Sequence, residues 1–132
     1  MSDALLAVVK FDDAGLVPAI AQQHDTGEIL MMAWMNRDAI EETLKTGRVC
    51  YWSRSRQALW RKGESSGQVQ SLKELIVDCD GDTLLLKVDQ IGVACHTGRR
   101  TCFYRAARDG ALVETHAVEI DPKALYGCGH SH

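Results

Sequence analysis

The sequence predicts a single α+β domain over residues 1–132, built mostly of antiparallel strands with one clear helix at about residues 36–46. Short strand-like runs are separated by turns that contain aspartate and glycine. Only one segment carries both the start and the stop signal of a helix. A length of 132 residues, 45% of them hydrophobic, suits one domain with a real core and leaves no room for a second domain.

The first part of the chain predicts a hairpin. Residues 1–17 carry little signal beyond a helical turn at 5–9 and a polar turn at 12–15. Strand-like runs follow at 19–23 and 28–35, and the Asp and Gly between them favour a tight connection of two antiparallel strands.

The helix has the clearest local signals. Asn36 is a favourable N-cap, apolar residues recur at helical spacing, and Gly47 is a typical C-terminal stop. A strand with aromatic residues and a buried Cys50 is expected next, at residues 48–52.

The second half predicts a loop and two more hairpins. Residues 53–67 have no single periodicity, which is typical of a long functional loop. Alternating residues predict strands at 68–77 and 83–88, joined by an Asp-Gly turn. A second Asp-Gly turn joins the strands expected at 103–107 and 112–116.

Composition excludes several classes of protein. A net charge of −3 gives no footprint for general nucleic-acid binding. The apolar start lacks a basic region before it, and no run approaches membrane-spanning length, which predicts a cytoplasmic protein. The five cysteines are then expected to be reduced thiols or metal ligands. Residues 121–132 predict a mobile tail, and we interpret its Cys128, His130 and His132 as part of that tail.

Three aspartates at every second position indicate a cation site. Asp78, Asp80 and Asp82 would share one face of an extended chain. Clustered carboxylates repel one another unless a positive charge lies among them, and oxygen ligands suit Mg²⁺ or Ca²⁺. The alternative is an ordinary polar hairpin turn.

Three cysteines indicate a second metal site. Cys95 and Cys102 lie in a polar, glycine-containing loop, and Cys79 lies upstream among the aspartates. Three thiolates would leave one coordination position of zinc open, which is the catalytic pattern. The alternative is that these cysteines are small buried hydrophobic residues.

His96 adjoins a presumed ligand, Cys95. A neutral imidazole there would accept a proton from an activated water. The alternatives are a fourth metal ligand or a hydrogen-bonded surface histidine.

Basic and aromatic residues in two loops indicate phosphate and base binding. Guanidinium groups bind phosphate in a bidentate manner, and an indole ring stacks on a base. The alternative is a solvated basic loop. The candidate substrate-binding residues are Arg54, Arg56, Trp60, Lys62, Arg99 and Arg100.

Five segments closely resemble the phosphoribosyl-AMP cyclohydrolase family of histidine biosynthesis. They are Leu-Met-Met-Ala-Trp-Met-Asn-Arg at 30–37, Tyr-Trp-Ser-Arg-Ser-Arg at 51–56, Leu-Trp-Arg-Lys-Gly-Glu-Ser-Ser-Gly at 59–67, Val-Asp-Cys-Asp-Gly-Asp at 77–82 and Ala-Cys-His-Thr-Gly-Arg-Arg-Thr-Cys-Phe-Tyr at 94–104. The resemblance covers residues 18–106 and leaves residues 1–17 and 121–132 outside it.

The resemblance implies hydrolysis of 1-(5-phosphoribosyl)-AMP, in which water attacks C6 of the adenine and the N1–C6 bond opens. It implies a homodimer with Zn²⁺ on Cys79 of one subunit and on Cys95 and Cys102 of the other. It also implies Mg²⁺ on the three aspartates and a role for His96 beside the zinc. The chain is expected to be the stand-alone cyclohydrolase, because it ends before a fused phosphoribosyl-ATP pyrophosphohydrolase domain.

Two competing functions remain on the residues alone. A zinc nucleobase deaminase would need His-x-Glu with Pro-Cys-x-x-Cys, and the sequence has neither pattern. A zinc-stabilised nucleotide- or RNA-binding module without catalysis would use Trp60 and the arginine-rich loop. The acidic balance of the chain argues against that module.

Overall fold

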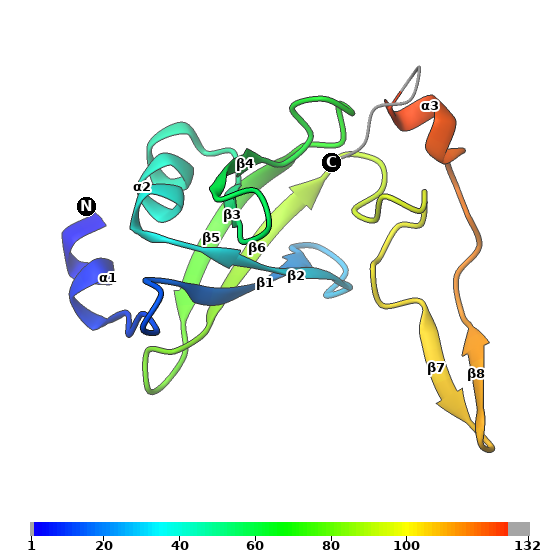
Figure 1. Ribbon diagram of the computed structural model, residues 1–132, viewed down its shortest axis with the longest axis horizontal. Coiled ribbons are helices and arrows are strands. Elements are labelled where there is room, and N and C mark those ends of the chain that lie inside the picture. Colours follow the sequence, from blue (N-terminus) through cyan, green and yellow to red (C-terminus); the bar gives the residue numbers. More distant parts are fainter. Residues whose placement is uncertain (1, 127–132) are drawn as a thin grey trace.

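The computed structural model describes residues 2–126, and its ribbon is shown in Figure 1. The elements in chain order are α1 (Ser2–Val8), β1 (Val17–Gln23), β2 (Ile29–Met35), α2 (Arg37–Thr46), β3 (Cys50–Ser53), β4 (Ala58–Arg61), β5 (Gln70–Val77), β6 (Leu84–Gln90), β7 (Arg105–Arg108), β8 (Ala111–Glu114) and α3 (Pro122–Tyr126). The predicted α+β class is confirmed. The Cys and His residues predicted to belong to the tail, Cys128, His130 and His132, lie outside the described residues.

One six-stranded sheet forms the body, with the strand order β4-β3-β2-β1-β6-β5. Its neighbours are antiparallel except for β1 and β6, which run parallel with Ala19 opposite Leu84. Strands β7 and β8 form a separate hairpin that stands away from this body (Figure 1). The prediction of mostly antiparallel strands therefore holds, with one parallel pair at the centre.

The core lies against the two central strands. Along β1 every second residue is buried, and β6 shows the same alternation. Val17 on β1 and Leu86 on β6 are fully buried. Helix α2 adds Ala39 and Ile40 to the same cluster. Period-two burial of aliphatic side chains is what positions these two strands in the sheet.

The predicted helix forms as its signals indicate. The Asn36 side chain accepts a hydrogen bond from the backbone N–H of Ala39 at 2.9 Å. Gly47 ends the helix with φ of 76°, and its N–H donates to the carbonyl oxygen of Thr43. Glycine adopts this left-handed conformation without a steric penalty, so the helix stops there.

The structure corrects the prediction at three places. The loop expected over residues 53–67 contains β4, which pairs with β3 and places Trp60 opposite Tyr51. The tail predicted from residue 121 begins with the short helix α3, which the sequence did not indicate, and its mobility stays a prediction. The helical turn expected at residues 5–9 begins earlier, as α1. Within the described residues no helix has the length and apolar character needed to cross a membrane.

Candidate functional site

The three predicted metal-binding aspartates lie together in the turn between β5 and β6, residues 78–83, which we call the acidic turn. Their carboxylate oxygens lie within 4.8 Å of one another, and all three residues are exposed. The turn, rather than an extended strand, brings them together. Asp78 Oδ1 accepts hydrogen bonds from the backbone N–H groups of Asp82 at 3.0 Å and Thr83 at 3.3 Å.

A glycine fixes the acidic turn against the N-terminal segment. Gly81 has φ of +80°, and a Cβ built on it would lie 2.2 Å from the carbonyl oxygen of Val8. Its own carbonyl oxygen accepts a hydrogen bond from the backbone N–H of Lys10 at 2.7 Å. Only glycine satisfies both the conformation and the close approach, so the aspartates are carried on a braced turn.

The aspartates influence one another electrostatically. The hydrogen bond that the Asp82 carboxyl donates to Asp80, followed by that to Asp78, raises the pKa of Asp82. Desolvation raises the pKa of Asp78, but hydrogen bonds from Asp82 and from the backbone N–H groups outweigh it and lower that pKa overall. A carboxylate cluster with this mutual repulsion is relieved by a cation among its oxygens, and oxygen-only ligands suit a hard divalent ion. The segment is therefore a polar hairpin turn that gathers three carboxylates, and the cation site on them stays a prediction.

Cys95 and Cys102 come together in the segment between β6 and β7, residues 91–104, which we call the thiol loop. The loop folds back on itself because the backbone N–H of Cys95 donates to the carbonyl oxygen of Arg99 at 3.1 Å. The backbone N–H of Cys102 donates to the carbonyl oxygen of Leu30 at 2.7 Å and so joins the loop to β2. Burial, followed by the adjoining Cys95 thiol, raises the pKa of Cys102 to about 12. Two neighbouring thiols of this kind form a soft ligand pair that suits zinc.

Polar side chains from other elements hold the thiol loop in place. The Lys62 side chain is buried, and its Nζ donates to the carbonyl oxygen of Ala94 at 2.7 Å. Gln68 Oε1 accepts from the backbone N–H of Val93 at 3.0 Å. Gln90 Nε2 donates to the carbonyl oxygen of Ile91 at 2.8 Å. Contacts within the chain therefore fix the position of the loop.

Lys62 lies beside both thiols. Its charge lowers the pKa of Cys102, and burial lowers the pKa of Lys62 itself against the opposite influence of the two cysteines. Its Nζ also lies 5.6 Å from the ring centroid of Trp60, which connects the thiol loop to β4. Because this Nζ is engaged inside the chain, the predicted phosphate contact of Lys62 stays a prediction.

Cys79 does not join the other two predicted ligands within one chain. It is exposed on the acidic turn, which precedes β6, whereas the thiol loop follows β6. The seven residues of β6 separate the two ends, a span of about 20 Å of extended chain. Figure 1 shows the β5–β6 turn and the thiol loop at opposite ends of the sheet. Over the described residues 2–126, the aspartates are the only group of three or more His, Cys, Asp or Glu side chains gathered closely enough for one ion.

His96 follows Cys95 in the tight turn of the thiol loop and is exposed. The backbone N–H of Gly98 donates to the carbonyl oxygen of Cys95 at 3.0 Å and closes this turn. Thr97 Oγ1 donates to Cys95 Sγ at 3.1 Å. His96 is thus carried on the same short, hydrogen-bonded turn as Cys95 and is exposed.

Arg54, Arg56 and Trp60 line one groove of about 460 Å³ on the outer strands. Two residues that the sequence reasoning did not select, Trp34 and Trp52, lie opposite each other on β2 and β3 and line it as well. We call these five residues the aromatic groove; Met32, Ala33, Ser53 and Ser55 complete its wall. The Arg54 guanidinium lies 4.6 Å from the Trp34 ring centroid. Since all three tryptophans of the chain line this groove, their clustering between residues 34 and 60 was the available signal.

The two arginines of the thiol loop are engaged within the chain. Arg100 donates to Gln23 Oε1 at 2.9 Å and to the carbonyl oxygen of Gly92 at 2.6 Å. Arg99 stacks on Tyr104 at 4.0 Å and forms an ion pair with Glu114 at 3.2 Å. Their predicted contact with substrate stays a prediction.

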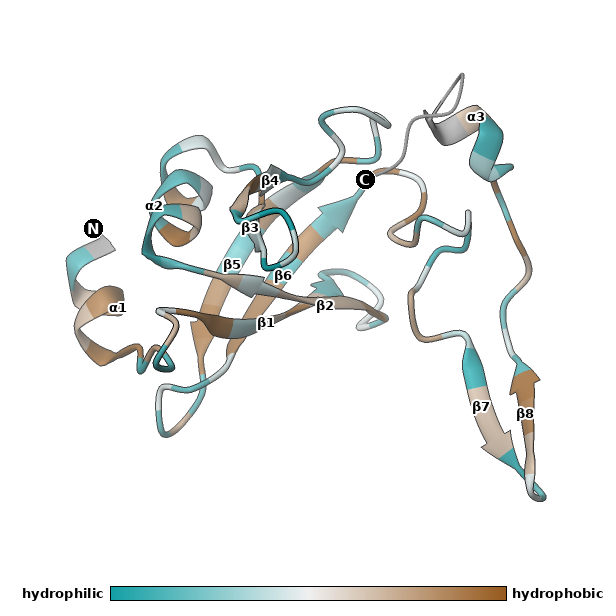
Figure 2. Cartoon of the chain, viewed as in Figure 1, coloured by the Kyte–Doolittle hydropathy of each residue, from teal (hydrophilic) through white to brown (hydrophobic). Residues whose placement is uncertain are grey.

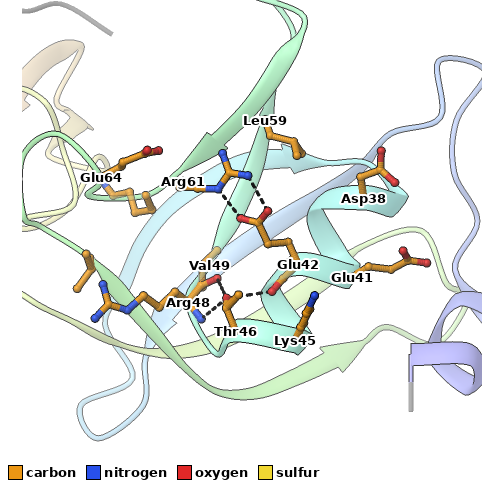
Figure 3. A pocket seen from close by; sticks show the side chains of 12 residues that line it. Asp38, Glu41, Glu42, Lys45, Thr46, Arg48, Val49, Leu59, Arg61 and Glu64 are labelled. Carbon is orange, nitrogen blue, oxygen red and sulfur yellow. Dashed lines mark hydrogen bonds and ion pairs between the residues drawn. The ribbon is translucent and has the colours of Figure 1, made fainter.

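A larger cavity of about 640 Å³ lies between α2 and the β3–β4 hairpin. Figure 3 shows Arg61 and Glu42 pointing toward each other across it, and this ion pair has an N···O distance of 2.7 Å. The wall carries equal numbers of acidic and basic side chains: Asp38, Glu41, Glu42 and Glu64 against Lys45, Arg48, Arg61 and Lys62. The wall gathers no excess of positive charge for a phosphate, and none of the predicted metal ligands lines it.

Comparison with known proteins gives one consistent result. Residues 31–104 match the family model described as phosphoribosyl-AMP cyclohydrolase. A protein of that name from Rhodospirillum centenum is 69% identical over 127 residues, which cover 96% of each chain. The protein of the same name from Paramagnetospirillum magneticum is 69% identical over 125 residues and 95% of each chain. That from Alcanivorax borkumensis is 73% identical over 117 residues, which cover 89% of this chain and 82% of the relative.

Proposed function

This chain belongs to the phosphoribosyl-AMP cyclohydrolase family, and from that premise we propose how its residues carry out the reaction. It is a hydrolase of histidine biosynthesis that opens the adenine ring of 1-(5-phosphoribosyl)-AMP at the N1–C6 bond. Water adds to C6, the N1–C6 bond breaks, and the formimino aminoimidazole carboxamide ribotide is formed. The observation that carries the residue assignment is the pair of thiols on a braced loop next to an exposed histidine.

The thiols are the proposed zinc ligands. Cys95 and Cys102 adjoin each other, and the partner's Cys79 would complete a set of three thiolates that leaves one coordination position open. When bound there, zinc would lower the pKa of a coordinated water to roughly 7, which makes hydroxide available at neutral pH. The thiols and their hydrogen-bonded loop fit this ion, since sulfur ligands favour zinc over hard cations.

His96 is the proposed proton acceptor. Its place beside Cys95 and its exposure would allow the imidazole to take a proton from the attacking water. The same imidazole would return that proton to N1 as the ring opens. Acid–base catalysis of this kind contributes about 10²- to 10⁴-fold to a rate.

The aromatic groove is the proposed substrate-binding surface. Indole rings of Trp34, Trp52 and Trp60 would stack on the purine, and Arg54 and Arg56 would bind phosphate. The groove connects to the thiol loop through Trp60 and Lys62. An acidic group of the chain is arranged so that a metal ion could bind to it. We assign Mg²⁺ to Asp78, Asp80 and Asp82, where it would order the turn or meet a phosphate.

A homodimer is proposed as the active form. The separation of Cys79 from Cys95 and Cys102 along β6 supports it, because a second copy could supply the missing thiol. Residues 1–132 would act as one cytoplasmic domain on a small nucleotide, without nucleic-acid or membrane partners. Mixing a Cys79→Ser protein with a Cys95→Ser protein should restore part of the activity that each lacks. No restoration after subunit exchange would contradict the shared site.

The proposal is tested by following the ultraviolet spectrum of phosphoribosyl-AMP with purified protein before and after chelation. Turnover should disappear when zinc is removed and return when Zn²⁺ is added. Cys102→Ser should lose zinc and activity together, whereas Cys50→Ala, a change at a fully buried thiol outside the site, should retain zinc. Full zinc in the Cys102 variant would refute that ligand. A metal-loaded protein that binds the nucleotide without turnover would favour the binding-module alternative.

A further inference from the structure

We propose that the hairpin of β7 and β8, residues 105–114, clasps a second copy of this chain and places that copy's acidic turn against the thiol loop. We call this hairpin the arm. The inference rests on the homodimer proposed above and adds the surface that makes it.

Beyond its base, the arm has little packing support from the other described helices and strands of its own chain. Strands β7 and β8 pair with each other through four residues each, and their extensive packing contacts among the described elements are with each other. A two-stranded hairpin on its own is marginally stable at best in water. Figure 2 shows β8 as one of the most hydrophobic segments of the chain, standing clear of the body. A segment with this geometry needs a partner surface.

Apolar side chains at the arm and its base face solvent in the single chain. Leu112 is 64% exposed and Phe103 is 57% exposed. Val113 and Val118 are exposed as well. Exposed apolar groups that gather on one projecting element indicate an interaction site more than isolated ones do.

The base of the arm is fastened to the thiol loop. Arg99, whose side chain is only 13% exposed, stacks on Tyr104 before β7 and pairs with Glu114 at the end of β8. The backbone N–H of Thr115 donates to the carbonyl oxygen of Tyr104 at 2.7 Å. After β8 the chain returns to the loop, where the N–H of Glu119 donates to the carbonyl oxygen of Gly98 at 2.8 Å. A partner held by the arm is therefore held at a defined place relative to Cys95 and Cys102.

The charges of the two surfaces favour the acidic turn of a second copy as the surface that the arm binds. Residues 99–115 carry four arginines and two carboxylates; Arg99 pairs with Glu114 and Arg100 with Glu28, which leaves Arg105 and Arg108 against one carboxylate. Residues 78–83 carry three aspartates and no basic residue. Opposite charge guides association and fixes its register. The same turn carries the exposed Cys79, the thiol that the single chain does not bring to the loop.

The end of the molecule that bears the acidic turn also offers apolar surface. Strand β5 is the outer strand of the large sheet, and its partly exposed residues Leu75, Ile76 and Val77 lead into the turn. Val8, which meets Gly81, is 52% exposed. In a two-fold symmetric dimer this contact would occur twice, because the arm of each copy would pack on the acidic end of the other.

The test is Leu112→Glu, with the mass in solution measured by analytical ultracentrifugation and zinc measured on the same samples. Wild-type protein should sediment as a dimer of the 14.6 kDa chain. Leu112→Glu should sediment as a monomer and should lose zinc, because Cys79 is no longer delivered. Leu44→Glu is the matched control: it changes another exposed leucine, on α2 and away from the arm, and should remain dimeric with full zinc.

A milder variant guards against misfolding of the charged one. Leu112→Ala should raise the dimer dissociation constant by about 100-fold, since an exposed leucine buried in the interface is truncated twice per dimer. A Leu112→Glu protein that stays dimeric with full zinc would refute the role of the arm in the dimer and would still agree with the shared zinc site. A monomeric variant that keeps zinc would support the arm and overturn Cys79 as a shared ligand. A wild-type monomer would overturn both.

Discussion

Gln90 offers the sharpest test of how the thiol loop is positioned. Its side chain is buried at the end of β6. Nε2 donates to the carbonyl oxygens of Ile91 at 2.8 Å and Gln68 at 3.0 Å, and Oε1 accepts from Gln70 Nε2 at 2.8 Å. Gln70 is fully buried, and its Oε1 in turn accepts from the Tyr51 hydroxyl at 2.7 Å.

Gln90→Leu should lower the free energy of unfolding by about 3 kcal/mol. The change leaves a buried N–H of the Gln70 amide without its acceptor, which costs about 1–3 kcal/mol. It also removes two further hydrogen bonds at about 1 kcal/mol each. The added burial of apolar surface offsets part of this loss. Gln22→Leu is the matched control, because the Gln22 amide bonds to Gly27 at the surface, and it should cost less than about 0.5 kcal/mol.

The double variant Gln70→Leu with Gln90→Leu separates the cost of an unpaired buried amide from the cost of the lost hydrogen bonds. When both amides are removed, neither is left buried without its hydrogen-bond partner. The double variant should therefore lose about 1–2 kcal/mol less free energy of unfolding than the sum of the two single variants. Urea unfolding of the zinc-loaded protein at one fixed concentration measures all four proteins. A cost below about 1 kcal/mol for Gln90→Leu, or strict additivity of the two changes, would refute the reasoning.

Four further expectations follow from the site. His96→Ala should retain zinc and lose about 10²- to 10⁴-fold in kcat, and near-normal turnover would exclude the proton role. Arg54→Ala should raise KM more than it lowers kcat in steady-state assays, whereas an unchanged KM would remove this residue from the substrate contacts. Addition of Mg²⁺ should raise the melting temperature of the wild type and not of Asp80→Asn; equal shifts would show that the ion binds elsewhere. The hydrogen bond from Arg61 lowers the pKa of Glu42, so this carboxylate stabilises the fold above its ordinary pKa and the contribution is lost as pH falls through the lowered value. The difference in melting temperature between wild type and Glu42→Gln should therefore shrink below about pH 4; a difference independent of pH would contradict this.

Local signals predicted much of the fold. The helix from Arg37 to Thr46 followed from Asn36 and Gly47, because capping depends on residues close in sequence. Strand β4 was missed because its four residues stand between polar turns and show little alternation of their own. The parallel pairing of β1 with β6 joins segments far apart in the chain, so no local pattern indicates it.

Only part of the candidate site could be predicted, because contacts between residues far apart in the chain leave no local sequence signal. Convergence of the aspartates could be expected from their spacing, although the tight turn at Gly81 brings it about. That Cys79 lies at the opposite end of β6 from Cys95 is a property of the sheet and not of the spacing. Gln90 gave no signal, because a glutamine at one strand position looks like a solvent-facing residue until its buried partners are known.

The central parallel pair has a consequence for the order in which the chain matures. Ala19 on β1 meets Leu84 on β6, so the middle of the sheet stays open during synthesis until most of the chain has left the ribosome. Contacts this distant in sequence form slowly and leave strand edges exposed in the meantime. Cys95 and Cys102 emerge only after β6, and their loop is tied to a sheet that must already have closed. At the zinc site proposed on these thiols, metal binding would therefore be a late event that requires the completed sheet.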